Sequence, residues 1–203
     1  MGLQSSVDVP CITSAAAAND LAQRRGWPML YDATCQFRHA KLKDLHALWC
    51  AMAERDGDIP YRLEMTARLL QPYMRMLVLF ERVVAAGSSR RYRVRLMGSS
   101  LVEALQDMTG RFLDEALPGR YLPRWYMKND ITLATGAPLR MLVRGDTFDR
   151  SYLVGEYICV PLRAGGGEIS LVLAAAYFDG TRPWTELAAE ECQRLGLELP
   201  ACV

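Results

Sequence analysis

Polar and apolar side chains alternate along part of this chain, which is the pattern of a half-buried strand. From residue 91 to residue 96, arginines alternate with Tyr92, Val94 and Leu96, so one face carries guanidiniums and the other carries apolar groups. Residues 74–84 are apolar on both faces at their centre, and we therefore expect both faces of this strand to be covered. The sequence also predicts a late hairpin, formed by residues 152–162, a glycine turn at 165–167 and residues 169–178.

Apolar positions three and four residues apart predict two longer helices, over residues 37–53 and 122–134. The first helix has one apolar stripe, made of Leu42, Leu45, Leu48, Trp49 and Met52. This helix is the candidate to cover the outer side of strand 74–84, either from the same chain or from a second copy. As an interface between two copies, we expect it to use Leu42, Leu45, Trp49 and Met52.

The segment from Tyr92 to Tyr121 carries the densest set of local signals. Gly98 ends the strand, and Ser100 with Glu103 has the S-x-x-E spacing of a capping box at a helix start. A Thr-Gly-Arg turn at residues 109–111 then ends that helix, and apolar residues resume after it. The expected order is strand, short helix, tight turn and second short helix.

This arrangement resembles the PAS domain, in particular the compact bacterial PAS family in which a strand ending in glycine leads into short helices through a Thr-Gly-Arg turn. The order of elements extends the likeness over about residues 42–180. The resemblance implies an α+β fold, a PAS-like five-stranded antiparallel sheet with short helices between strands 2 and 3 and an N-terminal helix covering the outer face. It also implies a sensory or adaptor role.

Composition favours one sensory domain with extensions. The chain has 203 residues, of which 51% are hydrophobic, enough for one domain with a core. We expect a flexible tail or loosely packed helix over residues 1–32, the PAS-like domain over 33–180, and a C-terminal extension over 181–203 with a helix from Trp184 to Leu195. The net charge of +1 argues against nucleic-acid and membrane partners, and with no apolar signal or spanning segment we expect a cytoplasmic protein.

Candidate chemistry is sparse. The two histidines, His39 and His46, precede the sensory core, so they favour neither a Ser-His-Asp triad nor an axial haem ligand. Cys35 with His39 and His46 with Cys50 form two i, i+4 pairs. Each pair could bind a metal ion only if a second chain supplied further ligands. The Asn-Cys-Arg-Phe-Leu-Gln motif of light-sensing flavin relatives is absent from the sequence. We therefore expect no catalytic residue, no metal, and neither haem nor flavin.

The remaining candidate is an apolar pocket with aromatic rims. The inward face of helix 122–134 carries most of the aromatic groups, while Lys128 and Asp130 are expected to lie elsewhere on that helix. The side chains that could line a ligand cavity, or alternatively fill the core, are Leu101, Leu105, Phe112, Tyr121, Trp125, Tyr126, Met141 and Tyr157.

Together these features predict a stand-alone PAS-type sensory or adaptor protein of bacterial signal transduction, with no catalytic output of its own. It would bind an unidentified small molecule, a signalling partner such as a kinase or regulator, or both, and we expect a homodimer. The alternative is a pure dimerisation module with a filled core and no ligand.

Overall fold

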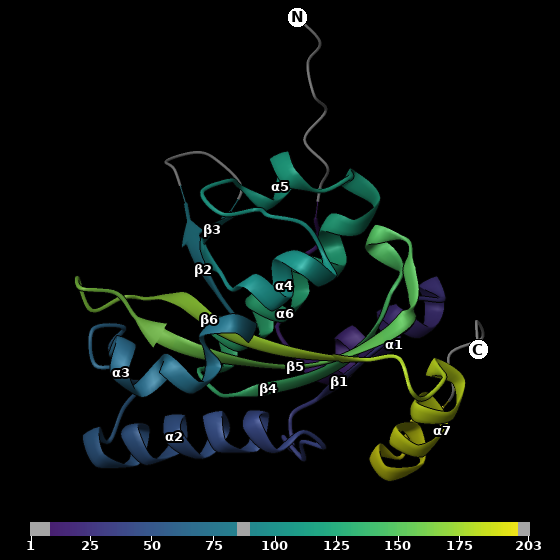
Figure 1. The fold of residues 1–203 in the computed structure, drawn as a ribbon, viewed down its shortest axis with the longest axis horizontal. Coiled ribbons are helices and arrows are strands. Elements are labelled where there is room, and N and C mark those ends of the chain that lie inside the picture. Colours follow the sequence, from purple (N-terminus) through teal and green to yellow (C-terminus); the bar gives the residue numbers. More distant parts are fainter. Residues whose placement is uncertain (1–8, 85–89, 199–203) are drawn as a thin grey trace, which may run out of the picture.

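The computed structural model describes residues 9–84 and 90–198, and its centre is a six-stranded antiparallel sheet. The strands lie in the order β1-β4-β5-β6-β2-β3, with helices on both faces of the sheet (Figure 1). Their bounds are Met29–Asp32 for β1, Leu77–Val83 for β2, Arg91–Met97 for β3, Leu139–Gly145 for β4, Arg150–Arg163 for β5 and Ile169–Asp179 for β6.

The helices divide into three groups by position in the chain. Three α-helices precede β2, three lie between β3 and β4, and one follows β6 in the described part of the chain. They are α1 (Ala15–Arg25), α2 (Ala40–Asp56), α3 (Ala67–Leu70), α4 (Ser99–Ala104), α5 (Leu113–Ala116), α6 (Leu122–Thr135) and α7 (Trp184–Leu195), with 3-10 turns at Gln71–Met76, Gly119–Tyr121 and Asp146–Phe148. No helix in the described ranges is both long and apolar enough to span a bilayer.

The predicted fold class is confirmed. Strands β2 to β6 form the PAS-like antiparallel sheet, α4, α5 and α6 lie between its second and third strands, and α2 covers the outer face. The sheet differs in one respect, because β1 adds a sixth strand beside β4. The predicted glycine turn between β5 and β6 and the terminal helix from Trp184 to Leu195 are also found.

We expected a flexible tail or a loosely packed helix before residue 33, and the structure has the helix α1 and the strand β1 there. Ser14 caps α1, and the Asn19 side chain bonds both the N–H and the carbonyl of Tyr31 at 2.8 and 2.9 Å. Ala18 and Ala22 are buried, because their small side chains let α1 pack closely beside the sheet. The four residues of β1 are also buried. Residues 1–8 lie outside the described part of the chain.

Two local predictions are wrong in detail. The expected strand 74–84 begins only at Leu77, because the preceding residues form a 3-10 turn. The Ser100–Glu103 capping box is absent, since the helix begins at Ser99 with Gly98 as its cap and no side-chain cap bond. Gly98 is required there for another reason: a Cβ at this position would lie 2.3 Å from the carbonyl oxygen of Met74.

The predicted dimer interface is instead an internal contact. Leu42, Leu45, Trp49 and Met52 are at most 6% exposed, and they pack on the outer face of the sheet in the same chain. Trp49 Nε1 also donates a hydrogen bond to the Pro161 carbonyl at 2.9 Å. The stripe therefore leaves almost no apolar surface for a second copy.

A buried ion network holds β1 and α7 against the outer face of the sheet, which is the face that α2 covers. Arg140 on β4 has no exposed side-chain surface, and its guanidinium lies 3.1 Å from Asp32 of β1, 2.6 Å from Glu156 of β5 and 2.8 Å from Glu191 of α7. Burial alone would raise the pKa of Glu191, but hydrogen bonds from Arg140 and Arg194 hold that pKa below its usual range.

The same network fixes the start of α2. The Glu156 carboxylate accepts hydrogen bonds from the backbone N–H groups of Arg38 and His39, both at 2.9 Å. The N–H of His39 belongs to the N-cap residue, which the N3 carboxylate of a capping box would bind, and here Glu156 supplies that acceptor from β5. One acidic residue of β5 thus links α2 to Arg140.

We predict that Arg140→Met lowers the free energy of unfolding by about 3–5 kcal/mol, because it leaves Glu156 buried without a cation and removes one of the cations that pair with Asp32 and Glu191, which keep Arg194. Chemical denaturation at neutral pH measures this. Arg182→Met is the matched control, since Arg182 pairs with Glu190 and Glu186 at the surface and its loss should change stability little. Equal effects of the two substitutions would contradict the structural role of the network.

Candidate lysine cavity

A buried amine marks the inner face of the sheet. Lys128 lies in the middle of α6 and is 2% exposed, although the sequence placed it away from the inward face. Residues 125–133 of α6 are all buried, because the helix is covered on nearly every side and not on one stripe. The prediction that Lys128 and Asp130 lie elsewhere is therefore wrong.

Three aromatic rings surround the Lys128 ammonium. Its nitrogen lies 4.2 Å from the ring centroid of Trp125, 4.7 Å from that of Phe80 and 5.2 Å from that of Tyr157. These rings come from α6, β2 and β5, so the cage forms only when the helix packs on the sheet. The negative faces of the rings attract a cation, and this partly offsets the loss of water.

The amine has no ionic partner in the described part of the chain. No carboxylate of residues 9–84 or 90–198 lies within ion-pair distance of it, and no hydrogen bond to it is found there. Burial lowers the pKa of Lys128 from 10.5 to about 8, and the nearby Cys159 only partly opposes this shift. Cys159 is itself buried, which raises the pKa of its thiol to about 11 and keeps it neutral.

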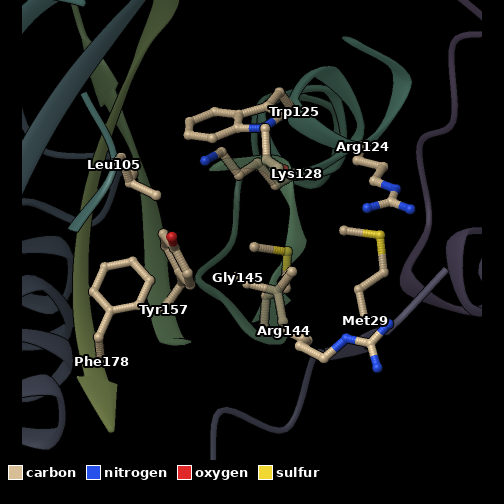
Figure 2. A pocket seen from close by; sticks show the side chains of 12 residues that line it. Met29, Leu105, Arg124, Trp125, Lys128, Arg144, Gly145, Tyr157 and Phe178 are labelled. Atoms are coloured by element: carbon tan, nitrogen blue, oxygen red, sulfur yellow. The ribbon is translucent and has the colours of Figure 1, made fainter. Parts of the chain in front are cut away.

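Lys128 faces a small cavity between α6 and the sheet (Figure 2). The cavity measures about 30 Å³, counted as space open to the centre of a water molecule, which is room for about two waters. Its walls are mainly apolar, and they also hold two further cations. The lining residues are Met29, Leu105, Arg124, Trp125, Lys128, Met141, Val143, Arg144, Gly145, Thr147, Tyr157 and Phe178.

The two arginines lie on the other side of the cavity from the lysine amine. In Figure 2 the Lys128 amine points toward Leu105 and Tyr157, whereas the guanidiniums of Arg124 and Arg144 lie at the opposite side, with the Met29 side chain between them in this view. Arg124 pairs with Asp146 at 2.7 Å. Within the described residues, Nε of Arg144 is buried without a hydrogen-bond partner. Positive charge therefore exceeds negative charge around this cavity.

The predicted ligand residues separate into two sets. Leu105, Trp125, Met141 and Tyr157 do line the cavity. The other four, Leu101, Phe112, Tyr121 and Tyr126, do not. Leu101 is fully buried core.

The aromatic residues outside the cavity have other contacts. Phe112 lies under the Arg91 guanidinium at 3.8 Å, Tyr121 is beside Arg120 and Arg124, and Tyr126 packs edge-on against Tyr92 at 5.1 Å. The alternation of residues and the helical spacing predicted that these side chains are buried. Burial alone did not predict which buried side chains line the cavity beside Lys128.

A second buried charge on α6 is fully paired. Asp130 accepts two hydrogen bonds from Arg90 at 2.6 Å and one from the Tyr92 hydroxyl at 2.7 Å. Arg90 also donates to the carbonyls of Val9 and Pro10, so this pair ties the N-terminal segment to α6. Asp130 thus has both an oppositely charged partner and a hydroxyl donor, whereas Lys128 on the same helix has no carboxylate partner among the described residues.

The cavity does not fit haem or flavin. Cofactor and drug-sized ligand pockets occupy roughly 300–1,000 Å³, far above the space beside Lys128. The two histidines lie at α2, on the opposite face of the sheet. His46 contacts Cys50 at 3.5 Å, and no group of three metal-ligating side chains occurs among the described residues.

Comparison with known proteins finds likeness at the level of structure. No protein-family model matches the chain, and no curated protein matches it. One similar solved structure is an RNA-binding light-oxygen-voltage receptor, at 14% identity and a TM-score of 0.39, covering 67% of this chain and 40% of that one. Another is the light state of the blue-light photoreceptor Aureochrome1 LOV, at 14% identity and a TM-score of 0.38, covering 61% of this chain and 96% of that one. The chain thus spans less than half the length of the RNA-binding receptor.

Proposed function

We propose that this protein is a PAS-type sensory module of signal transduction that binds a small molecule in the cavity beside Lys128 and acts by changing its contacts with a signalling partner. The single observation that carries the proposal is the buried lysine, which faces the cavity without a carboxylate partner in the described chain. Retaining such a group costs stability, and groups of this kind are concentrated at functional sites.

The sheet offers a route from the cavity to the opposite face. Tyr157 and Met141 line the cavity, while their neighbours Glu156 and Arg140 lie in the outer ion network. Successive side chains of a strand point to opposite faces, so a shift of β4 or β5 that admits a ligand moves both sets together. The network holds α7 and the start of α2.

The mechanism is a shift between two packings of α6 on the sheet. A ligand that binds one packing better than the other increases the population of that packing, by an amount set by its difference in affinity. The outer helices then present a different surface to a partner such as a kinase or regulator. The homodimer that we expected would need a surface other than the buried α2 stripe.

The second candidate is an interaction module without a ligand, and the small volume of the cavity favours it. About 30 Å³ is close to the void that ordinary core packing leaves. In that case, Leu105, Trp125, Met141 and Tyr157 would be core residues only. The two candidates differ in whether small molecules enter the cavity.

We predict that the protein binds members of a set of small amphipathic molecules with up to about four non-hydrogen atoms, the size nearest to the space beside Lys128, detected by ligand-observed NMR. Leu105→Phe, which narrows the cavity, should abolish these signals. Leu48→Phe is the matched control, because Leu48 is half-buried in the α2 core on the other face of the sheet. Binding that survives Leu105→Phe, or that is absent from the parent protein, would favour the interaction module.

We also predict that Lys128→Met stabilises the protein by about 3 kcal/mol at pH 7, and that this advantage disappears as the pH rises from 8 to 10.5. In this window the unfolded lysine keeps a proton that the folded lysine has lost, so the stability of the parent rises relative to that of the variant. Denaturation of both proteins at several pH values measures the difference. A stability difference between parent and variant that does not change with pH would mean that the Lys128 amine is paired with a carboxylate in the folded protein.

A further inference from the structure

Lysine is rare in this chain, and its one buried instance is unusual. The protein has 24 basic residues, of which 21 are arginine and only Lys41, Lys43 and Lys128 are lysine. Lys41 and Lys43 lie exposed at the start of α2. The chain thus uses arginine for its ion pairs, including the buried Arg140, and places a lysine where a cation has no carboxylate.

The difference between the two side chains is their ability to lose a proton. A guanidinium stays charged in proteins, whereas a lysine amine can become neutral when it is buried. Burial lowers the pKa of Lys128 to about 8, so roughly a fifth of it is neutral at pH 7.4, against about one in a thousand for an ordinary exposed lysine. A neutral amine is a nucleophile.

The surroundings of Lys128 suit a reaction with a carbonyl group. The cavity gives the nitrogen an adjacent space with mainly apolar walls, formed on the side to which the amine points by Leu105 and Tyr157. The rings of Trp125, Phe80 and Tyr157 stabilise positive charge at the nitrogen. A protonated imine carries the same charge at the same place, so the cage stabilises the product as it stabilises the ammonium.

We propose that Lys128 is a covalent docking site for a short aliphatic aldehyde or ketone, which it holds as a reversible imine. This inference rests on the proposed function, because it names the ligand class of the same cavity. The amine lone pair attacks the carbonyl carbon, and a proton passes from nitrogen to oxygen to give a carbinolamine. A second proton from solvent reaches the hydroxyl, the C–O bond breaks as the nitrogen lone pair forms the C=N bond, and water leaves a protonated imine, with no oxidant or reductant.

Reversibility and size agree with a sensory role. Hydrolysis returns the free amine and the carbonyl compound, so occupancy follows the concentration of the ligand. The cavity of about 30 Å³ restricts the carbonyl compound to a short chain unless α6 moves outward, and that movement is the change of packing in the proposed mechanism.

The test uses the whole protein with propanal and sodium cyanoborohydride, which reduces an imine to a stable secondary amine. Intact mass spectrometry followed by peptide mapping locates each propyl group. We expect Lys128 to be modified severalfold faster than Lys41 or Lys43 at pH 7.4, with a rate that rises with pH up to about 8. Lys128→Arg should remove this fast adduct while leaving modification of Lys41 and Lys43 unchanged.

Mapping on the parent protein keeps the test decisive even if the arginine variant folds poorly. Modification that is no faster at Lys128 than at the two exposed lysines would overturn the carbonyl inference. If small neutral molecules still bind the cavity by NMR in that case, the proposed function stands without it. If they do not bind either, both fail. A fast adduct at Lys128 that Leu105→Phe also abolishes would support both.

Discussion

The charge of Arg140 is the constraint on which the rest of the structure depends. A guanidinium without exposed surface must meet carboxylates, and here they come from three separate segments, β1, β5 and α7. The sheet therefore cannot close over Arg140 unless the first strand and the last helix are both in place. Glu156 extends the same requirement to the start of α2. One buried charge thus makes β1 and α7, which lie outside the expected domain limits of residues 33–180, integral parts of the folded domain.

The sequence predicted the central fold because each element has a local cause. Alternation around Tyr92, the Thr-Gly-Arg turn and the glycine turn at 165–167 are all short-range signals, and the structure contains the corresponding strand and turns. The α2 stripe was also correctly predicted as buried. Its covering partner was not decided by the sequence, because an apolar stripe has the same pattern whether it packs on its own sheet or on a second chain.

The parts that sequence reasoning missed depend on contacts between distant residues. The segment 15–32 is small and polar, yet Asn19 and the buried alanines hold it beside the sheet. Lys128 was assigned to a polar face because helical spacing assumes one apolar side, and α6 is covered nearly all round. The composition of the helix carried a signal, because residues 125–135 include only two charged side chains, Lys128 and Asp130, which is too few for a solvent-exposed face. Four of the eight predicted cavity residues line the space, since helical spacing predicts burial but not the position of a void.

The two buried cations give the two faces of the sheet a different tolerance of chemical change. Arg140 and Met141 are neighbours on β4, and their side chains lie on opposite faces. Changing the partners of Arg140 would break several ion pairs, so the outer face resists change. Lys128 has no carboxylate to lose among the described residues, so a proton or a ligand can change its state without breaking a pair. In the proposed mechanism, a proton or a ligand on the inner face alters the packing of α6, while the outer ion network keeps its pairs and moves α2 and α7 together with β4 and β5.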